Sequence, residues 1–247
     1  MDRALYIAMT GAKNNMLAQA NHSNNMANLN TNGFKADFEQ SRSMGVYYGD
    51  GQPTRAFALT ESPSANFESG PMITTGNPMD VAIQGNGFIA VQAPDGSEAY
   101  TRAGDLHVDA EGTLRTANGL AVIGNSGPIS LPPLNKMAIG SDGTISVIAL
   151  GQTVETMVDT NRIKLVNPDV KNLTKGTDGL FRQRDGLTAD VSADVRLANG
   201  VIEGSNVNAM NEFTQIIALS RQYEMQVKLM KTAEDNASAS AQLLQMS

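Results

Sequence analysis

Dipeptides that favour tight turns between β-strands recur along the middle of the chain. They are Asn86-Gly87, Asp95-Gly96, Glu111-Gly112, Asn118-Gly119, Asp142-Gly143, Asp178-Gly179, Asp185-Gly186 and Asn199-Gly200. Asn-Gly and Asp-Gly between short apolar runs are strong local signals of a β-hairpin. Such runs occur at residues 88–91, 106–108, 120–123, 144–148 and 162–166. Short strands at this spacing are typical of an antiparallel sandwich or barrel, so we expect an antiparallel β-rich domain.

Both ends of the chain have the apolar periodicity of α-helices. Residues 3–29 carry apolar side chains at steps of three and four, and residues 208–244 contain neither Gly nor Pro. In the C-terminal segment the spacing approximates a heptad seam. The predicted fold class is α+β, with the antiparallel β-rich domain inserted between N- and C-terminal helices.

These patterns divide the chain into a terminal helical assembly domain (1–33 and 205–247), an extended connector (34–76) and a β-rich domain (77–204). The narrow apolar stripes cannot be fully buried in one helix pair, so we expect them to contact other subunits. A contact that does not close on itself generates an open helical assembly. The candidate contact residues are Leu5, Met9, Ala12, Met16, Met26, Phe213, Ile216, Tyr223, Val227 and Met230.

Composition argues against several kinds of site. Lys+Arg 18 against Asp+Glu 25 gives a formal net charge of −7, a poor match for nucleic acid or anionic lipid. With 0 Cys and 2 His, neither a thiolate nor a multi-histidine metal centre is expected, and we predict no cofactor. No run of about 18 to 20 apolar residues predicts a membrane-spanning helix, and polar residues interrupt the start of the chain where a cleaved signal needs an apolar run.

An enzyme is the first alternative to a structural role. A glycoside hydrolase needs two carboxylates flanking one cleft, but nothing selects a pair among those beside expected turns, which are Asp80, Asp105, Asp109 and Glu111. A serine triad would have to use His22, in a helix, or His107, in a strand. The oxygen-rich turn at 105–111 could supply calcium ligands, but it lacks the EF-hand spacing. We therefore expect no catalytic site.

Three segments resemble signatures of the bacterial flagellar rod and hook proteins. Residues 25–35 read NMANLNTNGFK, which is similar to the N-x-A-N-x-x-T-x-G-F-K signature of that family. Residues 203–208 (EGSNVN) resemble its C-terminal element. Residues 76–83 (GNPMDVAI) and 100–104 (YTRAG) resemble its shared β domain. Because the matches span both ends and the centre, the resemblance covers nearly the whole chain.

The resemblance implies a structural subunit of the flagellar basal-body rod. Family members are exported unfolded through the flagellar type III apparatus, without a cleaved signal, and polymerise in the periplasm. Their terminal helices form the inner, coiled-coil-like layer of a hollow rod, and the β domain lies outside it, so the same layer is expected of the two helices here. The rod transmits motor torque and conducts subunits that are exported later. The expected partners are other rod proteins and the export apparatus, with self-assembly possible and neither nucleic acid nor membrane insertion involved.

Within the family, the length and the opening residues Met1-Asp2 and Leu5-Tyr6 are similar to those of proximal-rod members. A distal-rod protein of similar plan is the alternative inside the family. A β-domain adaptor that dimerises through its helices is the alternative outside it.

Some residues of the motif segments are expected to mark the ends of the terminal helices and to turn the chain. A left-handed glycine and side chains that bind backbone groups commonly end a helix and turn the chain. The residues assigned this role are Asn25, Asn28, Thr31, Gly33, Phe34, Ser205 and Asn206.

Overall fold

The structure is a computed structural model that describes residues 3–45, 56–149 and 158–245. It divides into two compact units. One, here called the helical unit, comprises Met1–Leu29, Asp37–Ala65 and Val207–Ser247. The other, here called the body, comprises Asn30–Ala36 and Asn66–Asn206.

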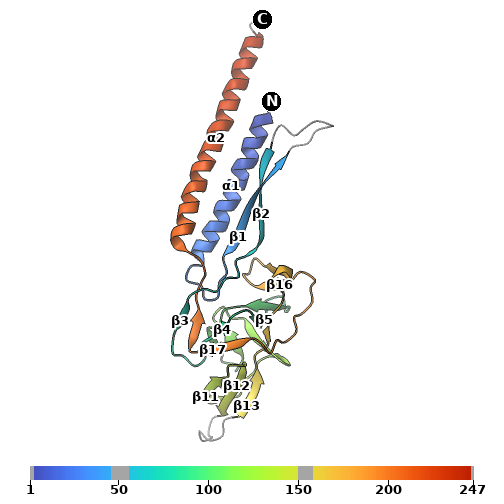
Figure 1. Cartoon of the computed structure of the whole chain (residues 1–247), viewed down its shortest axis with the longest axis vertical. Coiled ribbons are helices and arrows are strands. Elements are labelled where there is room, and N and C mark those ends of the chain that lie inside the picture. The colour runs from blue at the N-terminus through green and yellow to red at the C-terminus, as the bar shows by residue number, and fades with distance from the viewer. Residues whose placement is uncertain (1–2, 46–55, 150–157, 246–247) are drawn as a thin grey trace. The chain divides into compact units, whose positions relative to one another are not determined.

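In the helical unit, α1 (Arg3–Ala27) and α2 (Ala209–Gln245) lie side by side and run in opposite directions (Figure 1). Both helices match their expected ranges to within two residues. Strands β1 (Asp37–Gly45) and β2 (Ala56–Ala65) pair antiparallel and contact α1. Thus the segment expected as an extended connector contains a β-hairpin. Among the described residues, no helix is both long and apolar enough to cross a membrane.

The prediction that the two helices form a coiled-coil-like layer is wrong. A coiled coil buries apolar side chains of both helices along one seam, but no side chain of α2 described between residues 209 and 242 is buried. Two of its expected seam residues, Phe213 and Val227, are 53% and 41% exposed. Helix α1 contacts the hairpin as well as α2, so its environment is not that of a two-helix seam. The α+β class itself fits the structure.

The reason lies in the size of the side chains that α1 buries. Its buried apolar residues are Ala8, Ala12 and Ala18, whereas the bulkier Met9 and Met16 are exposed. A Cβ atom added at Gly11 would lie 3.0 Å from the side chain of Gln226 on α2. Small residues let helices approach closely, so the pattern of large apolar residues was the wrong guide to the buried face.

The body is built from short strands, and all the pairings recorded between them are antiparallel, as the turn dipeptides predicted. The strands are β3 (Met72–Thr74), β4 (Val81–Gln84), β5 (Phe88–Gln92), β6 (Glu98–Thr101), β7 (Leu106–Val108), β8 (Leu114–Thr116), β9 (Ala121–Gly124), β10 (Gly127–Pro128), β11 (Leu134–Ile139), β12 (Thr144–Ala149), β13 (Val158–Arg162), β14 (Leu165–Val166), β15 (Leu173–Lys175), β16 (Phe181–Gln183), β17 (Arg196–Asn199) and β18 (Val201–Glu203), with a 3-10 turn at Val170–Asn172. The strand expected at 162–166 is divided between β13 and β14, with Ile163 forming an isolated bridge to Gly124.

The largest sheet has the order β15-β16-β6-β5-β9-β8-β7, with β10 on β9 and β14 on β5. A second sheet has the order β11-β12-β13. Buried Val, Ile and Leu side chains from both sheets form one core, including Ile89, Val122 and Ile145. The last two strands pair with early ones, β17 with β4 and β18 with β3. The C-terminal part of the body is thereby bound beside its N-terminal part.

Candidate functional site

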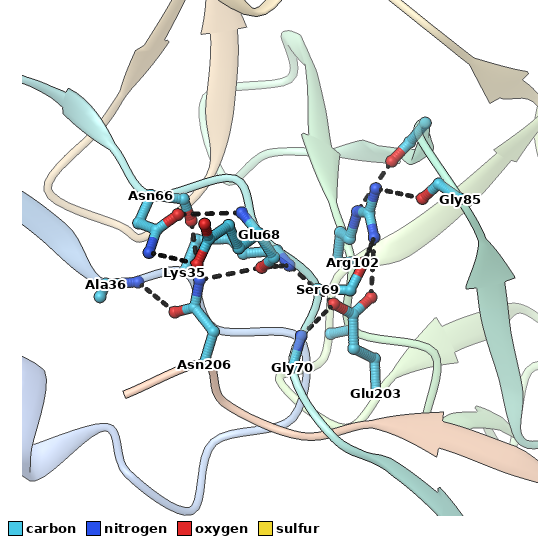
Figure 2. A network of polar contacts seen from close by, with 12 residues as sticks. Lys35, Ala36, Asn66, Glu68, Ser69, Gly70, Gly85, Arg102, Glu203 and Asn206 are labelled. Atoms are coloured by element: carbon cyan, nitrogen blue, oxygen red, sulfur yellow. Dashed lines mark hydrogen bonds and ion pairs between the residues drawn. The ribbon is translucent and has the colours of Figure 1, made fainter. Parts of the chain in front are cut away.

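Three charged side chains, one from each of the three motif segments, meet in the interior of the body. Lys35 ends the first motif, Arg102 lies in the middle one and Glu203 begins the last. The Nζ atom of Lys35 is 2.6 Å from Oε1 of Glu203, and Nη1 of Arg102 is 3.0 Å from Oε2 (Figure 2). The side chains are 1%, 3% and 0% exposed, respectively. We call these three residues the root cluster.

Main-chain groups provide further hydrogen-bond partners for the root cluster. Lys35 also donates to the carbonyl of Glu68 at 2.7 Å, and the N–H of Gly70 donates to Oε1 of Glu203 at 3.0 Å. Arg102 donates to the carbonyls of Gly87 at 3.0 Å and Gly85 at 2.7 Å. Buried charges are tolerated when they are paired and hydrogen-bonded in this way, and removal of one partner is then strongly destabilising.

The electrostatics of the root cluster are unbalanced, because two cations share one carboxylate. Burial lowers the pKa of the Lys35 ammonium, and the hydrogen bond and charge of Glu203 offset only part of that effect. Burial would raise the pKa of the Glu203 carboxyl, but the hydrogen bond from Lys35 and the charge of Arg102 outweigh it and hold that pKa below its usual value. Glu203 is therefore the group on which the other two depend.

Two glycines permit the close packing around this cluster. Gly33 has φ +68°, and a Cβ atom there would lie 2.3 Å from the backbone of Arg102 and Ala103. A Cβ atom at Gly70 would lie 2.1 Å from the carbonyl oxygen of Gly204. Backbone segments from distant parts of the chain therefore touch where only glycine fits.

Asn206 adds a second link between the same segments. Its Oδ1 accepts from the N–H of Ala36 at 2.8 Å, and its Nδ2 donates to the carbonyls of Asn66 at 2.8 Å and Glu68 at 2.9 Å (Figure 2). One side-chain amide thus binds three main-chain groups. With the bond from the N–H of Gly33 to the carbonyl of Glu203 at 2.7 Å, the N-terminal and C-terminal segments of the body are joined at several points.

In the helical unit, Asn25 holds the start of the hairpin. Its Oδ1 accepts from the N–H of Asp37 at 2.8 Å and its Nδ2 donates to the carbonyl of the same residue at 3.1 Å. The buried amide therefore binds both main-chain polar groups of Asp37, whose partner on β2 is Ala65. One turn earlier, Nδ1 of His22 lies 2.6 Å from Oε2 of Glu212, which links α1 to α2. Nearby on β1, burial raises the pKa of Glu39.

The other residues expected at the ends of the helices have the following places in the structure. Asn28 donates to the carbonyl of Asn24 at 2.9 Å at the end of α1. The carbonyl of Thr31 accepts from the N–H of Phe34 at 3.3 Å, and the ring of Phe34 lies 3.9 Å from Nζ of Lys175. Ser205 is buried. Gly33 adopts the expected left-handed conformation but lies six residues beyond the last residue of α1 (Arg3–Ala27), so its role is close packing and not helix capping.

The residues expected at subunit contacts fall into three groups within the helical unit. Met9, Met16, Phe213 and Val227 are exposed, Leu5, Met26, Ile216, Tyr223 and Met230 are half-buried, and Ala12 is buried. Sequence reasoning did not single out Lys35, Arg102 or Glu203, although each lies in a quoted motif. Opposite charges in motif segments far apart in the chain were the available signal.

Three of the four carboxylates weighed for catalysis or calcium binding accept hydrogen bonds from neighbouring side chains of the body. Asp109 binds Arg115 at 2.5 Å, and this hydrogen bond lowers its pKa to about 2. Asp105 accepts from Asn32 at 3.0 Å, and Asp80 accepts from Thr75 at 2.6 Å. Over the described ranges 3–45, 56–149 and 158–245, no group of three His, Cys, Asp or Glu side chains is placed to hold a metal ion.

Comparison with known proteins gives consistent matches along the chain. Residues 82–147 match the model of the flagellar hook protein FlgE/F/G D1 domain, and residues 198–243 match that of the flagellar basal body rod FlgEFG protein C-terminal region. The flagellar basal-body rod protein FlgF of Escherichia coli K12 is 40% identical over 257 aligned residues, which cover 100% of both chains. FlgF of Salmonella typhimurium LT2 is 37% identical with the same coverage. FlgG of Buchnera aphidicola from Schizaphis graminum is 32% identical over 97% of this chain and 99% of its own.

Proposed function

Because this chain belongs to the family of flagellar basal-body rod proteins and is a structural subunit of that rod, we propose that it occupies the proximal part of the rod. The observation that carries this position is the full-length similarity to FlgF, at 40% and 37% identity, against 32% to FlgG. A place in the distal rod is the competing assignment.

Assembly would use the helical unit. Met9, Met16 and Phe213 expose large apolar side chains there, and burying such a side chain contributes roughly 1.5–3 kcal/mol. Neighbouring rod subunits would bury these apolar side chains, and repetition of the contact would extend the hollow shaft. In this arrangement the body lies on the outside of the shaft, and the shaft transmits torque and conducts later subunits.

The chain would reach this position through the flagellar type III export apparatus, without a cleaved signal, and would join the rod in the periplasm. Its partners would be the other rod proteins, further copies of itself and the export apparatus. The resemblance of residues 25–35 and 203–208 to the family signatures supports this route.

The proposed role is non-enzymatic. The carboxylates Asp80, Asp105 and Asp109 each bind a neighbouring side chain, which supports a structural use of these groups. The two histidines also lie in different units, His22 in the helical unit and His107 in the body.

Replacing Met16 by Asp tests assembly through the helical unit. Met16 is 56% exposed, so the substitution leaves the fold intact while placing a charge on the proposed contact surface. The matched control is Leu187→Asp, since Leu187 is 68% exposed in the body. In a strain that lacks the native protein, Met16→Asp should abolish swimming and remove the chain from purified hook–basal bodies. Leu187→Asp should preserve both.

Mass spectrometry and crosslinking of the hook–basal bodies test the identity and the position. Wild-type chain at low copy, crosslinked to proximal-rod proteins, would support the proposal. Crosslinks to hook subunits would place the chain in the distal rod. A chain absent from the particles and found as a discrete dimer would overturn the rod role, and normal assembly of Met16→Asp would overturn the contact surface.

A further inference from the structure

Three segments that lie far from Glu203 in the chain converge on its carboxylate. Lys35 is 168 residues away in sequence, Gly70 is 133 and Arg102 is 101. Figure 2 shows Lys35 on one side of this network and Arg102 on the other, with Gly70 between them. Glu203 is the last of these groups in chain order, so it is also the last to emerge during synthesis.

Without Glu203, the root cluster could not be buried at low cost. Lys35 and Arg102 would be two cations in one dry site, and the charge of Arg102 already lowers the pKa of Lys35. Their other partners accept hydrogen bonds but neutralise no charge, being the hydroxyl of Ser69 and the carbonyls of Glu68, Gly85 and Gly87. An unpaired buried ion costs several kcal/mol, so both side chains would stay in water until the carboxylate arrives.

The local hairpins of the core have no such dependence. They pair strands that are close in sequence, such as β5 with β6 and β7 with β8. Strands β4 and β17 of the same core pair across a long loop, with Ile83 opposite Leu197, but this contact is apolar and needs no counterion. The N–H of Leu114 donates to Ile129 and that of Ile129 donates to Val122, all within a short stretch. Local pairings form before contacts that close loops of more than 100 residues.

We propose that closure of the root cluster is a separate, last step in the folding of the body, and that the Glu203 carboxylate triggers it. Until then, the segment at 30–36 and the segment at 203–206 are both released from the body. Closure binds them to each other through the bond from the N–H of Gly33 to the carbonyl of Glu203. It binds the second segment to the rest of the body through the bond from the N–H of Gly204 to the carbonyl of Pro71. This step would control when the two segments leading to the terminal helices become fixed. It depends on the body alone and not on the rod assignment.

Pulse-labelled hydrogen exchange during refolding of the full chain, read by NMR, tests the order of events. The amides of Leu114 and Ile129 report on the core, and those of Gly33, Gly70 and Gly204 report on the root cluster. In the wild type, the core amides should become protected first and the root amides in a later phase. Protection of both sets in one phase would overturn the proposal.

The variant Glu203→Gln should leave the core phase unchanged, while the root amides exchange roughly 100- to 1,000-fold faster than in the wild type. Adding Lys35→Met to this variant removes one of the two unpaired cations and should restore part of the protection. The matched control is Glu98→Gln, since Glu98 pairs with Lys164 at 2.8 Å in the same body. The control should keep root protection unchanged relative to the core.

Other results for the variants would overturn the proposal. If the core of Glu203→Gln gains no protection at all, closure is not a separate step. If the root amides of Glu203→Gln are protected as in the wild type, or if Lys35→Met restores nothing, Glu203 is not the trigger.

Discussion

The ammonium of Lys35 lies 2.6 Å from a carboxylate oxygen of Glu203, although 168 residues separate them in sequence. The chain passes from the body into the helical unit at Asp37 and again at Val207. Lys35 lies two residues before the first of these positions, and Glu203 lies four residues before the second. The same ion pair therefore fixes both segments of the body that continue into the helical unit. The ion pair has a structural role, and its contribution to the free energy of unfolding can be measured.

Substitutions at the two partners should differ in cost. Glu203→Gln leaves two buried cations without a counterion and should lower the free energy of unfolding by about 3–5 kcal/mol. Lys35→Met leaves the Arg102–Glu203 pair balanced and should cost about 1–2 kcal/mol. Urea unfolding of both variants, followed by circular dichroism, checks the difference. Equal costs would contradict a role for Glu203 as the shared counterion.

The body should lose stability in acid partly through Glu203. Its pKa lies below the ordinary value of 4.5, so its contribution is fully present above pH 4.5 and is lost as the pH falls through the lower folded value. Lys35 has a linkage of the same sign at higher pH, because its pKa lies below 10.5 in the folded chain and stability rises as the pH increases from that lower value towards 10.5.

Comparison with Glu203→Gln isolates the acid contribution from that of other carboxylates. Between pH 6 and 3, the urea midpoint of the wild type should fall more steeply than that of the variant. Parallel curves would show that Glu203 does not titrate differently in the folded and unfolded chains.

Tyr100 should ionise far above the range of an exposed tyrosine. Burial raises its pKa to about 12, although the N–H of Ala189, which donates to its hydroxyl at 2.6 Å, works in the other direction. Because the folded pKa exceeds the ordinary value of 10.0, the body should lose stability as the pH rises from 10 through about 12. Ultraviolet titration of tyrosinate should show a late phase that Tyr100→Phe removes. A late phase that persists in this variant would assign it to another group.

Gly33→Ala should be far more damaging than the same change at Gly119. Both glycines have positive φ, +68° and +79°, but an added Cβ atom meets backbone only at Gly33 and has nothing within 4 Å at Gly119. The backbone conformation alone should cost about 1–2 kcal/mol at Gly119. At Gly33 the clash with Arg102 and Ala103 should raise the cost above about 3 kcal/mol. Thermal unfolding of the two variants tests this, and similar melting temperatures would contradict close packing at Gly33.

Features that depend on short-range patterns were predicted well from the sequence. The Asn-Gly and Asp-Gly dipeptides indicated turns, and glycines such as Gly96 and Gly143 do adopt positive φ. Helical periodicity located α1 and α2 to within two residues. The packing of the helices was predicted wrongly, because the pattern of Met and Leu residues does not show that α1 buries its alanines.

The sequence by itself determined the local conformations and the family signatures, since turn propensity and helical periodicity act over a few neighbouring residues. Only the tertiary structure decided that Lys35, Arg102 and Glu203 share one dry site. From the sequence alone, each of these charged residues would be taken for a surface group. Their burial depends on a counterion more than 100 residues away, which the sequence does not identify. The close approach at Gly33 was decided in the same way, by backbone that arrives from another part of the chain.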